Sequence, residues 1–296
     1  MTTLAPFELH RAHSVAEASS FMDDLGDDAV IYSGGTELLL LMKLGFAEYG
    51  HLIDIKPIDE LDRLEVHDGT LLIGGAVTHR TLERSGIVRA GWPDFVEMER
   101  RVANVRVRSQ GSLGGNLAFA DPHSDPATFL LAADASVTLG RGEEHRTLPL
   151  DQFVLGPYET ALRPGELLCV IEVPALPAGA AMSHLRFSFH ERPAATVSAW
   201  LRCHDGRIAE ARVAVGSVGV VPVLVPGVAD ALVGQPVGAI DADALTTVGH
   251  TAADASEPVT DSNGSDEYKH ALVQTLVGRA VNEAAARAAS PRGITT

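Results

Sequence analysis

Cysteine is scarce in this sequence, which contains only Cys169 and Cys203. An iron–sulfur cluster is normally held by about four thiolates, so the chain cannot form one from its own cysteines. A disulfide between the two is not expected in a reducing compartment. The sequence also lacks an uninterrupted apolar run of about 18 residues and a basic, apolar leader. We therefore expect a cytoplasmic protein that does not insert into a membrane.

Positive charge is in short supply as well. Lys and Arg total 23 against 39 Asp and Glu, which gives a formal net charge of −16. Such a surface repels phosphate at long range, and this argues against a nucleic-acid partner. The 296 residues, 46% of them hydrophobic, are enough for two or three folded units with substantial cores.

Familiar catalytic and metal-binding motifs are missing. The 12 histidines are scattered: His10 and His13 flank a predicted strand end, and His190-Glu191 lacks the second histidine of HExxH. Residues 216–219 resemble a nucleophile elbow, but Val215 stands where GxSxG requires glycine. The sequence therefore predicts no catalytic residue and no metal ligand in this chain.

The first 56 residues predict a small βαβαβ unit. Strands are expected at 7–10, 29–32 and 51–55, because β-branched and apolar residues cluster there. A helix is expected to begin after Ser14, which forms a capping box with Glu17, and to run through Leu25. A second helix is expected over 36–44, with Gly45 as its C-cap.

Two further units are expected, at 57–177 and 178–290, and the whole chain reads as α+β. Asp68-Gly69 and Asp205-Gly206 each separate two alternating segments, a strong hairpin signal. The remaining predictions are helices at 78–85, 93–102, 126–133, 225–233, 241–255 and 266–289, strands at 135–139 and 167–173, and a linker at 174–177.

The first glycine motif, residues 33–37 (SGGTE), joins a predicted strand to a predicted helix. Glycines allow backbone N–H groups to approach a ligand that a Cβ would block, and a helix N-terminus favours a pyrophosphate. The pattern is neither GxGxxG nor GxxxxGK[ST], so neither a Rossmann nor a Walker site is predicted. A tight turn with no ligand explains this motif equally well.

The second glycine motif, residues 111–116 (GSLGGN), offers Ser112, two glycine amides and the Asn116 side chain within five positions. A turn-rich segment follows and fixes the direction of Asp125, whose carboxylate can accept from ribose hydroxyls or an adenine amine. Helix capping alone also accounts for Asp125. Together the two motifs predict a surface that holds an extended, doubly anionic ligand such as a dinucleotide.

Three segments resemble, in order and spacing, the successive signatures of one family. They are residues 32–38 (YSGGTEL), 73–78 (IGGAVT) and 106–117 (RVRSQGSLGGNL). The family is the FAD-binding medium subunit of the molybdenum hydroxylases, which includes xanthine dehydrogenase and aerobic carbon monoxide dehydrogenase. The resemblance covers about residues 5–285. It implies a two-subdomain FAD-binding unit of the vanillyl-alcohol oxidase (PCMH) type and a smaller C-terminal α+β domain.

The resemblance also implies which residues contact FAD. Residues 31–38 would wrap the pyrophosphate and approach the flavin, 112–116 would supply the second glycine contact, and Asp125 would lie at the adenosine end. The expected cofactor-binding residues are Ile31, Tyr32, Ser33, Gly34, Gly35, Thr36, Glu37, Leu38, Thr78, Val102, Ser112, Leu113, Gly114, Gly115, Asn116, Asp125, Leu168 and Arg186.

Some of these residues carry an alternative, and two positions depart from the family pattern. Thr78 is expected near the flavin, although capping of the following helix explains it as well. Arg186 stands where relatives often place a lysine near the flavin, and an exposed strand cation is the competing interpretation. Residues 192–195 (RPAA) stand where some relatives have an aromatic beside the isoalloxazine, which would leave one flavin face more open.

The function implied is electron transfer within a heteromeric molybdenum hydroxylase. Molybdopterin would belong to a large partner subunit and two [2Fe–2S] clusters to a small one, in a dimer of heterotrimers. This chain would receive electrons singly on FAD and pass them to an external acceptor, the redox chemistry being the cofactor's. The alternatives are a stand-alone FAD-dependent NAD(P)H oxidoreductase on the same scaffold and a non-catalytic flavin-binding protein.

Overall fold

The N-terminal unit is a three-stranded parallel sheet whose strands are joined by two helices. The computed structural model describes residues 4–289. Strand order is β1-β3-β2, with both neighbouring pairs parallel, so the predicted βαβαβ unit is confirmed. Its elements are β1 (Glu8–Arg11), α1 (Val15–Leu25), β2 (Ala29–Tyr32), α2 (Leu38–Leu44) and β3 (His51–Asp54).

Local signals set the ends of the two helices in this unit. Ser14 Oγ accepts a hydrogen bond from the Glu17 N–H, as the capping box predicts. Gly45 ends α2 with a left-handed φ of 75°, which glycine adopts without steric cost. The predicted start of α2 at residue 36 is wrong by two residues, because residues 36 and 37 complete the turn after the first glycine motif.

The middle unit is built on a five-stranded antiparallel sheet of order β4-β5-β10-β6-β7. Its strands are β4 (Leu64–His67), β5 (Thr70–Gly74), β6 (Ser136–Arg141), β7 (Glu144–Pro149) and β10 (Leu167–Pro174), with a small ladder of β8 (Val154–Gly156) and β9 (Glu159–Thr160) beside them. Its helices are α3 (His79–Arg84), α4 (Gly86–Gly91), α5 (Pro93–Glu99), α6 (Val105–Gln110), α7 (Leu113–Phe119) and α8 (Asp125–Ala132).

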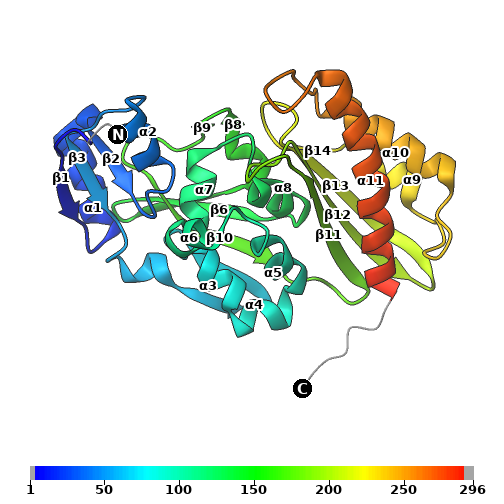
Figure 1. The fold of residues 1–296 in the computed structure, drawn as a ribbon. Coiled ribbons are helices and arrows are strands. Elements are labelled where there is room, and N and C mark those ends of the chain that lie inside the picture. The colour runs from blue at the N-terminus through cyan, green and yellow to red at the C-terminus, as the bar shows by residue number, and fades with distance from the viewer. Residues whose placement is uncertain (1–3, 290–296) are drawn as a thin grey trace.

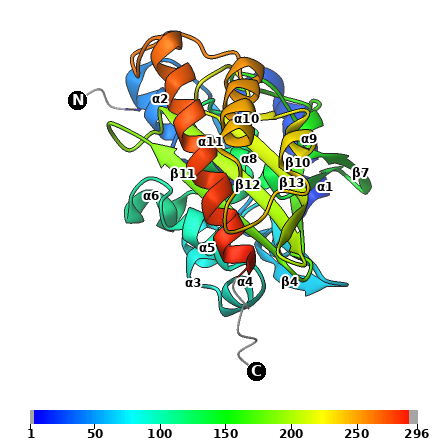
Figure 2. The same ribbon diagram turned by 90° about the vertical axis from the view of Figure 1, so that its right-hand side faces the viewer.

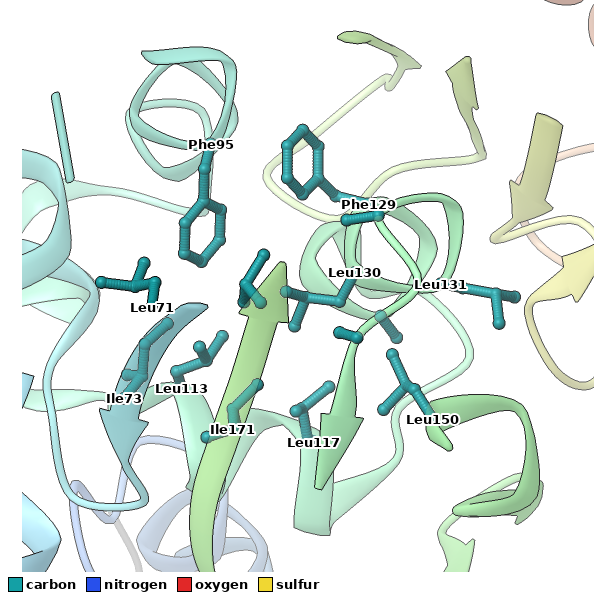
Figure 3. Close-up of a cluster of buried hydrophobic side chains, with 14 of the residues drawn as sticks. Leu71, Ile73, Phe95, Leu113, Leu117, Phe129, Leu130, Leu131, Leu150 and Ile171 are labelled. Carbon is teal, nitrogen blue, oxygen red and sulfur yellow. The ribbon is translucent and has the colours of Figure 1, made fainter. Parts of the chain in front are cut away.

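The helices of the middle unit bury their apolar side chains against this sheet (Figure 3). Phe95 of α5 stacks on Phe129 of α8, with ring centroids 5.4 Å apart, and Leu113 of α7 is fully buried. Burial of such side chains contributes roughly 1.5–3 kcal/mol each. This core therefore holds α7, and with it the second glycine motif, at a fixed position over the strands.

The C-terminal unit is a four-stranded antiparallel sheet covered by helices. In Figure 2, α11 runs across β11 and β12, and its buried stripe includes the predicted Leu276, Val277 and Ala280. The opposite face of this sheet packs against α8 of the middle unit. Its elements are β11 (Ala180–Phe187), β12 (Ala195–His204), β13 (Arg207–Gly216), β14 (Val223–Leu224), α9 (Val228–Leu232), α10 (Ala242–Ala255) and α11 (Asp266–Ala289).

Both predicted hairpins form. At the β4–β5 turn Asp68 and Gly69 have φ of 48° and 78°, and at the β12–β13 turn Asp205 and Gly206 have φ of 48° and 72°. Two successive residues with positive φ are typical of the tight turn that matches the twist of an antiparallel pair. Figure 1 shows the N- and C-terminal units at opposite ends, with the middle unit between them.

Several elements were not predicted. Helices α4 and α6 are only six residues each, too short for an apolar periodicity to appear, and strands β7 and β11 were also missed. The second glycine motif, expected as a loop, lies largely in the first turn of α7. Among residues 4–289, no helix is long and apolar enough to cross a membrane.

Candidate functional site

A cavity of about 520 Å³ opens between the N-terminal and middle units and reaches the 191–193 segment of the C-terminal unit. This volume falls within the range of roughly 300–1,000 Å³ typical of small-molecule and cofactor sites. Both glycine motifs contribute to its wall. The wall also carries apolar side chains, among them Ile31, Leu38 and Leu168.

The first glycine motif follows β2 and turns sharply into α2. Gly35 has φ of +66°, and a Cβ there would lie 2.4 Å from the Tyr32 ring, so the turn requires glycine. Gly34 has no unusual φ, but its Cβ would lie 2.1 Å from the Gln110 carbonyl oxygen. Glycine is needed at position 34 because this backbone lies directly against the chain that leads into the second motif.

The two glycine motifs therefore meet, although about eighty residues separate them. Ser33 Oγ and Ser112 Oγ share a hydrogen bond of 2.9 Å. The close approach of Gly34 to Gln110 and Gly111 continues this contact along the backbone. The predicted convergence of the two motifs is confirmed, and it creates a continuous wall of small residues.

The second motif differs in kind from the expected loop. Ser112 is the N-cap of α7, and its Oγ accepts from the Gly115 N–H at 3.1 Å. A Cβ on Gly114 would lie 2.4 Å from the Gly75 carbonyl oxygen, so this glycine allows α7 to pack against the chain after β5. Gly114 therefore allows close packing of the backbone, and it also forms part of the cavity wall.

Asp125 is buried at the start of α8, with 4% of its surface exposed. Its Oδ1 accepts from His184 Nε2 at 3.2 Å, and its Oδ2 accepts from Arg186 Nη1 at 3.0 Å. The interpretation of Asp125 as a solvated cap is wrong, since Ser124 occupies the N-cap position and Asp125 joins α8 to β11. The carboxylate also lines the cavity.

Arg186 lies behind Asp125 and is not part of the cavity wall. Its Nη1 donates to Arg101 O and its Nη2 to Glu191 O, both at 2.5 Å. The side chain is only 12% exposed, so the interpretation as an exposed strand cation is wrong. Its charge faces a carboxylate that it holds in place.

All but four of the predicted cofactor residues line the cavity. Besides Arg186, the exceptions are Tyr32, whose ring lies 4.0 Å from Lys56 Nζ, Thr78 and Leu113, which is fully buried in the core. Thr78 caps α3 by accepting from the Thr81 N–H, so the capping interpretation is confirmed. The lining residues are Ile31, Ser33, Gly34, Gly35, Thr36, Glu37, Leu38, Val102, Ser112, Gly114, Gly115, Asn116, Asp125 and Leu168.

Sequence reasoning missed the role of Arg192, a cavity-lining residue of the C-terminal unit that pairs with residues of the other two units. Its Nη2 donates to Glu37 Oε2 at 2.7 Å, and its Nη1 lies 2.5 Å from Asp121 Oδ2. Burial disfavours the charge on Arg192, but Asp121 and Glu37 outweigh it and raise its pKa. The charge pattern alone carries no signal for this contact, because the three residues are far apart in the sequence.

Three other titratable groups of the middle unit also have shifted pKa values. Hydrogen bonds from Arg146 outweigh burial and lower the pKa of Glu166, which lines the cavity. Burial, with the nearby charge of Asp121, raises the pKa of Tyr158. The buried Cys169 thiol has its pKa raised to about 12, mainly by desolvation, so it is not a reactive thiolate.

Two family models match nearly the whole chain. Residues 5–176 match the FAD binding domain in molybdopterin dehydrogenase, and residues 189–284 match the CO dehydrogenase flavoprotein C-terminal domain. The chain belongs to this family of FAD-binding subunits. The predicted architecture, a PCMH-type FAD-binding unit followed by a C-terminal α+β domain, is confirmed.

Individual relatives agree with this assignment. The carbon monoxide dehydrogenase medium chain of Hydrogenophaga pseudoflava is 33% identical over 285 residues, covering 96% of this chain and 98% of the relative. The nicotine 6-hydroxylase medium subunit of Paenarthrobacter nicotinovorans is 32% identical over 262 residues, covering 88% and 91%.

A solved structure agrees as well. The carbon monoxide dehydrogenase of H. pseudoflava that lacks the Mo-pyranopterin moiety matches with a TM-score of 0.92 and 32% identity, over 97% of this chain and 99% of that one. The chain is thus an oxidoreductase flavin subunit. This assignment favours the subunit over the stand-alone reductase.

The cavity of this flavin subunit suits FAD. Its glycine motifs present backbone where a Cβ would collide with neighbouring chain, and hydroxyls of Ser33, Thr36 and Ser112 lie beside them. Ile31, Val102 and Leu168 supply apolar surface for a planar ring system. Bound FAD supplies the redox chemistry, while this chain binds it, orients it and excludes water from it.

Proposed function

We propose that this flavin subunit passes electrons from the [2Fe–2S] clusters of a partner subunit to an external acceptor. The observation that carries the proposal is one cavity formed by two distant glycine motifs in a family of FAD-binding subunits. With two cysteines in all, the chain cannot form such a cluster on its own thiols, which supports placing the clusters in a partner.

The assembly proposed is a large molybdopterin-binding subunit, a small [2Fe–2S] subunit and this chain, paired as a dimer of heterotrimers. Relatives named as medium chains or subunits of larger enzymes support the presence of partners. We place the complex in the cytoplasm, which the free thiols of Cys169 and Cys203 support. The units proposed within this chain are 1–56, 57–177 and 178–290, of which residues 1–3 and 290 lie outside the described range.

Within the cavity, we assign the pyrophosphate to the wall formed by residues 33–37 and 112–116. Asp125 is assigned to the adenosine end, where its remaining lone pairs can accept from the ligand. Val102 and Leu168 are assigned to the flavin ring. Arg186 acts from behind Asp125 as a positioning residue, and Thr78 by capping α3 beside the same wall.

The experiment is reconstitution with defined partners. The purified chain should bind FAD and show flavin absorption near 370 and 450 nm (roughly, as for an oxidised flavin). Co-expressed with its molybdopterin and iron–sulfur partners, it should be reduced by the organic substrate of the complex. A chain that turns over NAD(P)H and a small substrate with no partner would contradict the proposal, and so would bound FAD that no partner reduces.

A further inference from the structure

Glu8, His10 and His51 meet at one end of the N-terminal parallel sheet. Glu8 of β1 lies opposite His51 of β3 in the strand register, and His10 is on the same face of β1 because side chains alternate along a strand. His10 Nε2 lies 3.0 Å from His51 Nδ1, and Glu8 Oε2 lies 3.9 Å from the same Nδ1. All three ligand atoms fall within 4.8 Å of one another.

This spacing suits a shared metal ion. Two nitrogens 3.0 Å apart, each bound at about 2.1 Å, would subtend an angle of roughly 90°, as for neighbouring ligands of an octahedral ion. A separation of about 3.4 Å would give the tetrahedral angle of zinc. Glu8 is exposed, so its side chain is free to rotate the short distance required.

The surroundings hold the two imidazoles in place. The Phe21 ring lies 5.1 Å from the His10 ring. On the other side of His51, Asp28 Oδ2 lies 4.0 Å from Nε2, and Asp28 is itself fixed by the Gly50 N–H. At 4.0 Å the Asp28 carboxylate lies beyond hydrogen-bond distance of His51 Nε2, and it adds negative charge beside the two imidazoles.

We propose that Glu8, His10 and His51 form a binding site for a divalent first-row transition ion such as Zn²⁺ or Ni²⁺. Imidazole nitrogens select these ions over Mg²⁺ and Ca²⁺, which prefer an all-oxygen set. The nearby carboxylates of Glu8 and Asp28 attract a cation. The ion would tie the edge strand β1 to β3, and it is independent of the flavin cavity.

The test is a titration of the tag-free full chain with Ni²⁺ and, separately, Zn²⁺, followed by calorimetry. One-to-one binding is expected, and His10→Gln or His51→Gln should each weaken it at least about tenfold. The matched control is His67→Gln, whose imidazole is 75% exposed beside Asp68 and should leave binding unchanged. Absence of saturable binding, or binding that survives both histidine substitutions, would overturn the proposal.

A separate observation concerns a buried ion pair beside the cavity. His79 is 2% and Glu99 0% exposed, and His79 Nδ1 lies 2.8 Å from Glu99 Oε2. The second oxygen, Glu99 Oε1, is buried with no hydrogen-bond partner. A carboxylate in such a place costs several kcal/mol unless it has a close polar partner, and the ring nitrogen Nδ1 of His79 is that partner.

His79 lies where the two glycine motifs meet. Its backbone N–H donates to Gly111 O at 3.1 Å. A Cβ on Gly111 would have the Thr36 hydroxyl at 3.4 Å and the His79 ring at 3.5 Å. The ring lines the cavity, and among the described residues its Nε2 has no hydrogen-bond partner.

The His79 imidazole matters because the charged side chains of the cavity wall are mostly carboxylates. The wall carries only one Arg or Lys side chain within the described residues, Arg192, which is already paired with Glu37 and Asp121. His123 is occupied by Pro193 O and Asp261. The carboxylates on the wall are Glu37, Asp121, Asp125, Glu166 and Glu191. A cationic or N–H donor side chain would stabilise a pyrophosphate here, and within residues 4–289 the Nε2 of His79 is the imidazole nitrogen on the wall that has no partner.

We infer that Glu99 holds His79 so that its Nε2–H donates to the pyrophosphate of FAD. This inference rests on FAD binding in the proposed function. His79→Gln and Glu99→Gln should each lower the affinity of the apoprotein for FAD and for ADP about tenfold, the size of one charge-assisted hydrogen bond. Affinity for riboflavin, which has no phosphate, should stay unchanged and also reports that the variants fold.

The possible outcomes distinguish failure of the proposed function from failure of the role inferred for His79. If the wild-type apoprotein takes up no FAD, the proposed function fails. If it binds FAD and both variants bind FAD and ADP equally well, the role of His79 fails. Equal losses for riboflavin and ADP would place His79 away from the phosphates and overturn the inference, while His67→Gln serves again as the surface control.

Discussion

Replacing Gly34 by alanine tests whether contact between the two glycine motifs builds the cavity. The added Cβ would lie 2.1 Å from Gln110 O and 2.6 Å from Gly111 Cα. Ordinary contacts of this kind lie at 3.4–4 Å, so one backbone must move by more than 1 Å. Gly34 has no positive φ, and the effect is therefore steric alone.

Overpacking of this kind costs typically 1–3 kcal/mol. The displaced backbone is also the cavity wall, so the substitution should lower both stability and FAD affinity. The melting temperature should fall by about 2–4 °C per kcal/mol, and the affinity for FAD should fall about tenfold per 1.4 kcal/mol. Thermal denaturation of the apoprotein and a flavin fluorescence titration measure the two effects.

The matched control is Gly86→Ala at the start of α4, where a Cβ meets nothing within 4 Å and φ is not positive. It should be neutral, or stabilising by up to about 1 kcal/mol. The reasoning is refuted if Gly34→Ala melts and binds FAD like the wild type, since the two backbones would then not be in contact in solution.

Three further predictions concern charged groups at the site. Arg192→Ala should speed FAD release about fivefold in stopped-flow fluorescence, since a half-exposed ion pair contributes about 1 kcal/mol; an unchanged rate would mean that Arg192 does not close the cavity. Arg186→Met should weaken FAD binding about fivefold in a fluorescence titration, because it removes the cation that holds Asp125 in place at the cavity wall, an ion pair worth about 1 kcal/mol; an unchanged affinity would exclude that positioning role. The lowered pKa of Glu166 means that its bond to Arg146 stabilises the fold above the ordinary value of 4.5 and is lost as pH falls through the lower, folded pKa. The melting-temperature gap between wild type and Arg146→Met should accordingly shrink on acidification, and a gap independent of pH would contradict this.

Much of the fold followed from local patterns. The capping box of Ser14, the Gly45 terminus and both Asp-Gly turns act within a few residues, and such signals are legible without tertiary context. The short helices α4 and α6 were missed because six residues cannot display an amphipathic period. The second glycine motif was taken for a loop, since its glycines disfavour a helix unless packing requires them.

The sequence predicted which residues form the candidate site better than it predicted how those residues are arranged. Most of the expected cofactor residues line the cavity, because they sit in two motifs whose small side chains already indicated a ligand wall. Arg186 was assigned to the flavin by resemblance, yet the structure places Asp125 between it and the cavity. The contacts of Arg192 were not predicted, because its partners, Glu37 and Asp121, belong to different units of the chain.

The sequence by itself determined most of the strands, both Asp-Gly turns and the long helices, the two glycine motifs that expose backbone, and that no iron–sulfur cluster can form on this chain's own thiols. Only the tertiary structure decided that Gly34 and Gly114 are required by backbone packing, that His10 meets His51 rather than His13, and that Glu99 accompanies His79. The physical reason is the distance along the chain over which each kind of interaction acts. Caps, turns and periodicities act over a few residues, whereas hydrogen bonds, steric contacts and ion pairs act between atoms that only folding brings together.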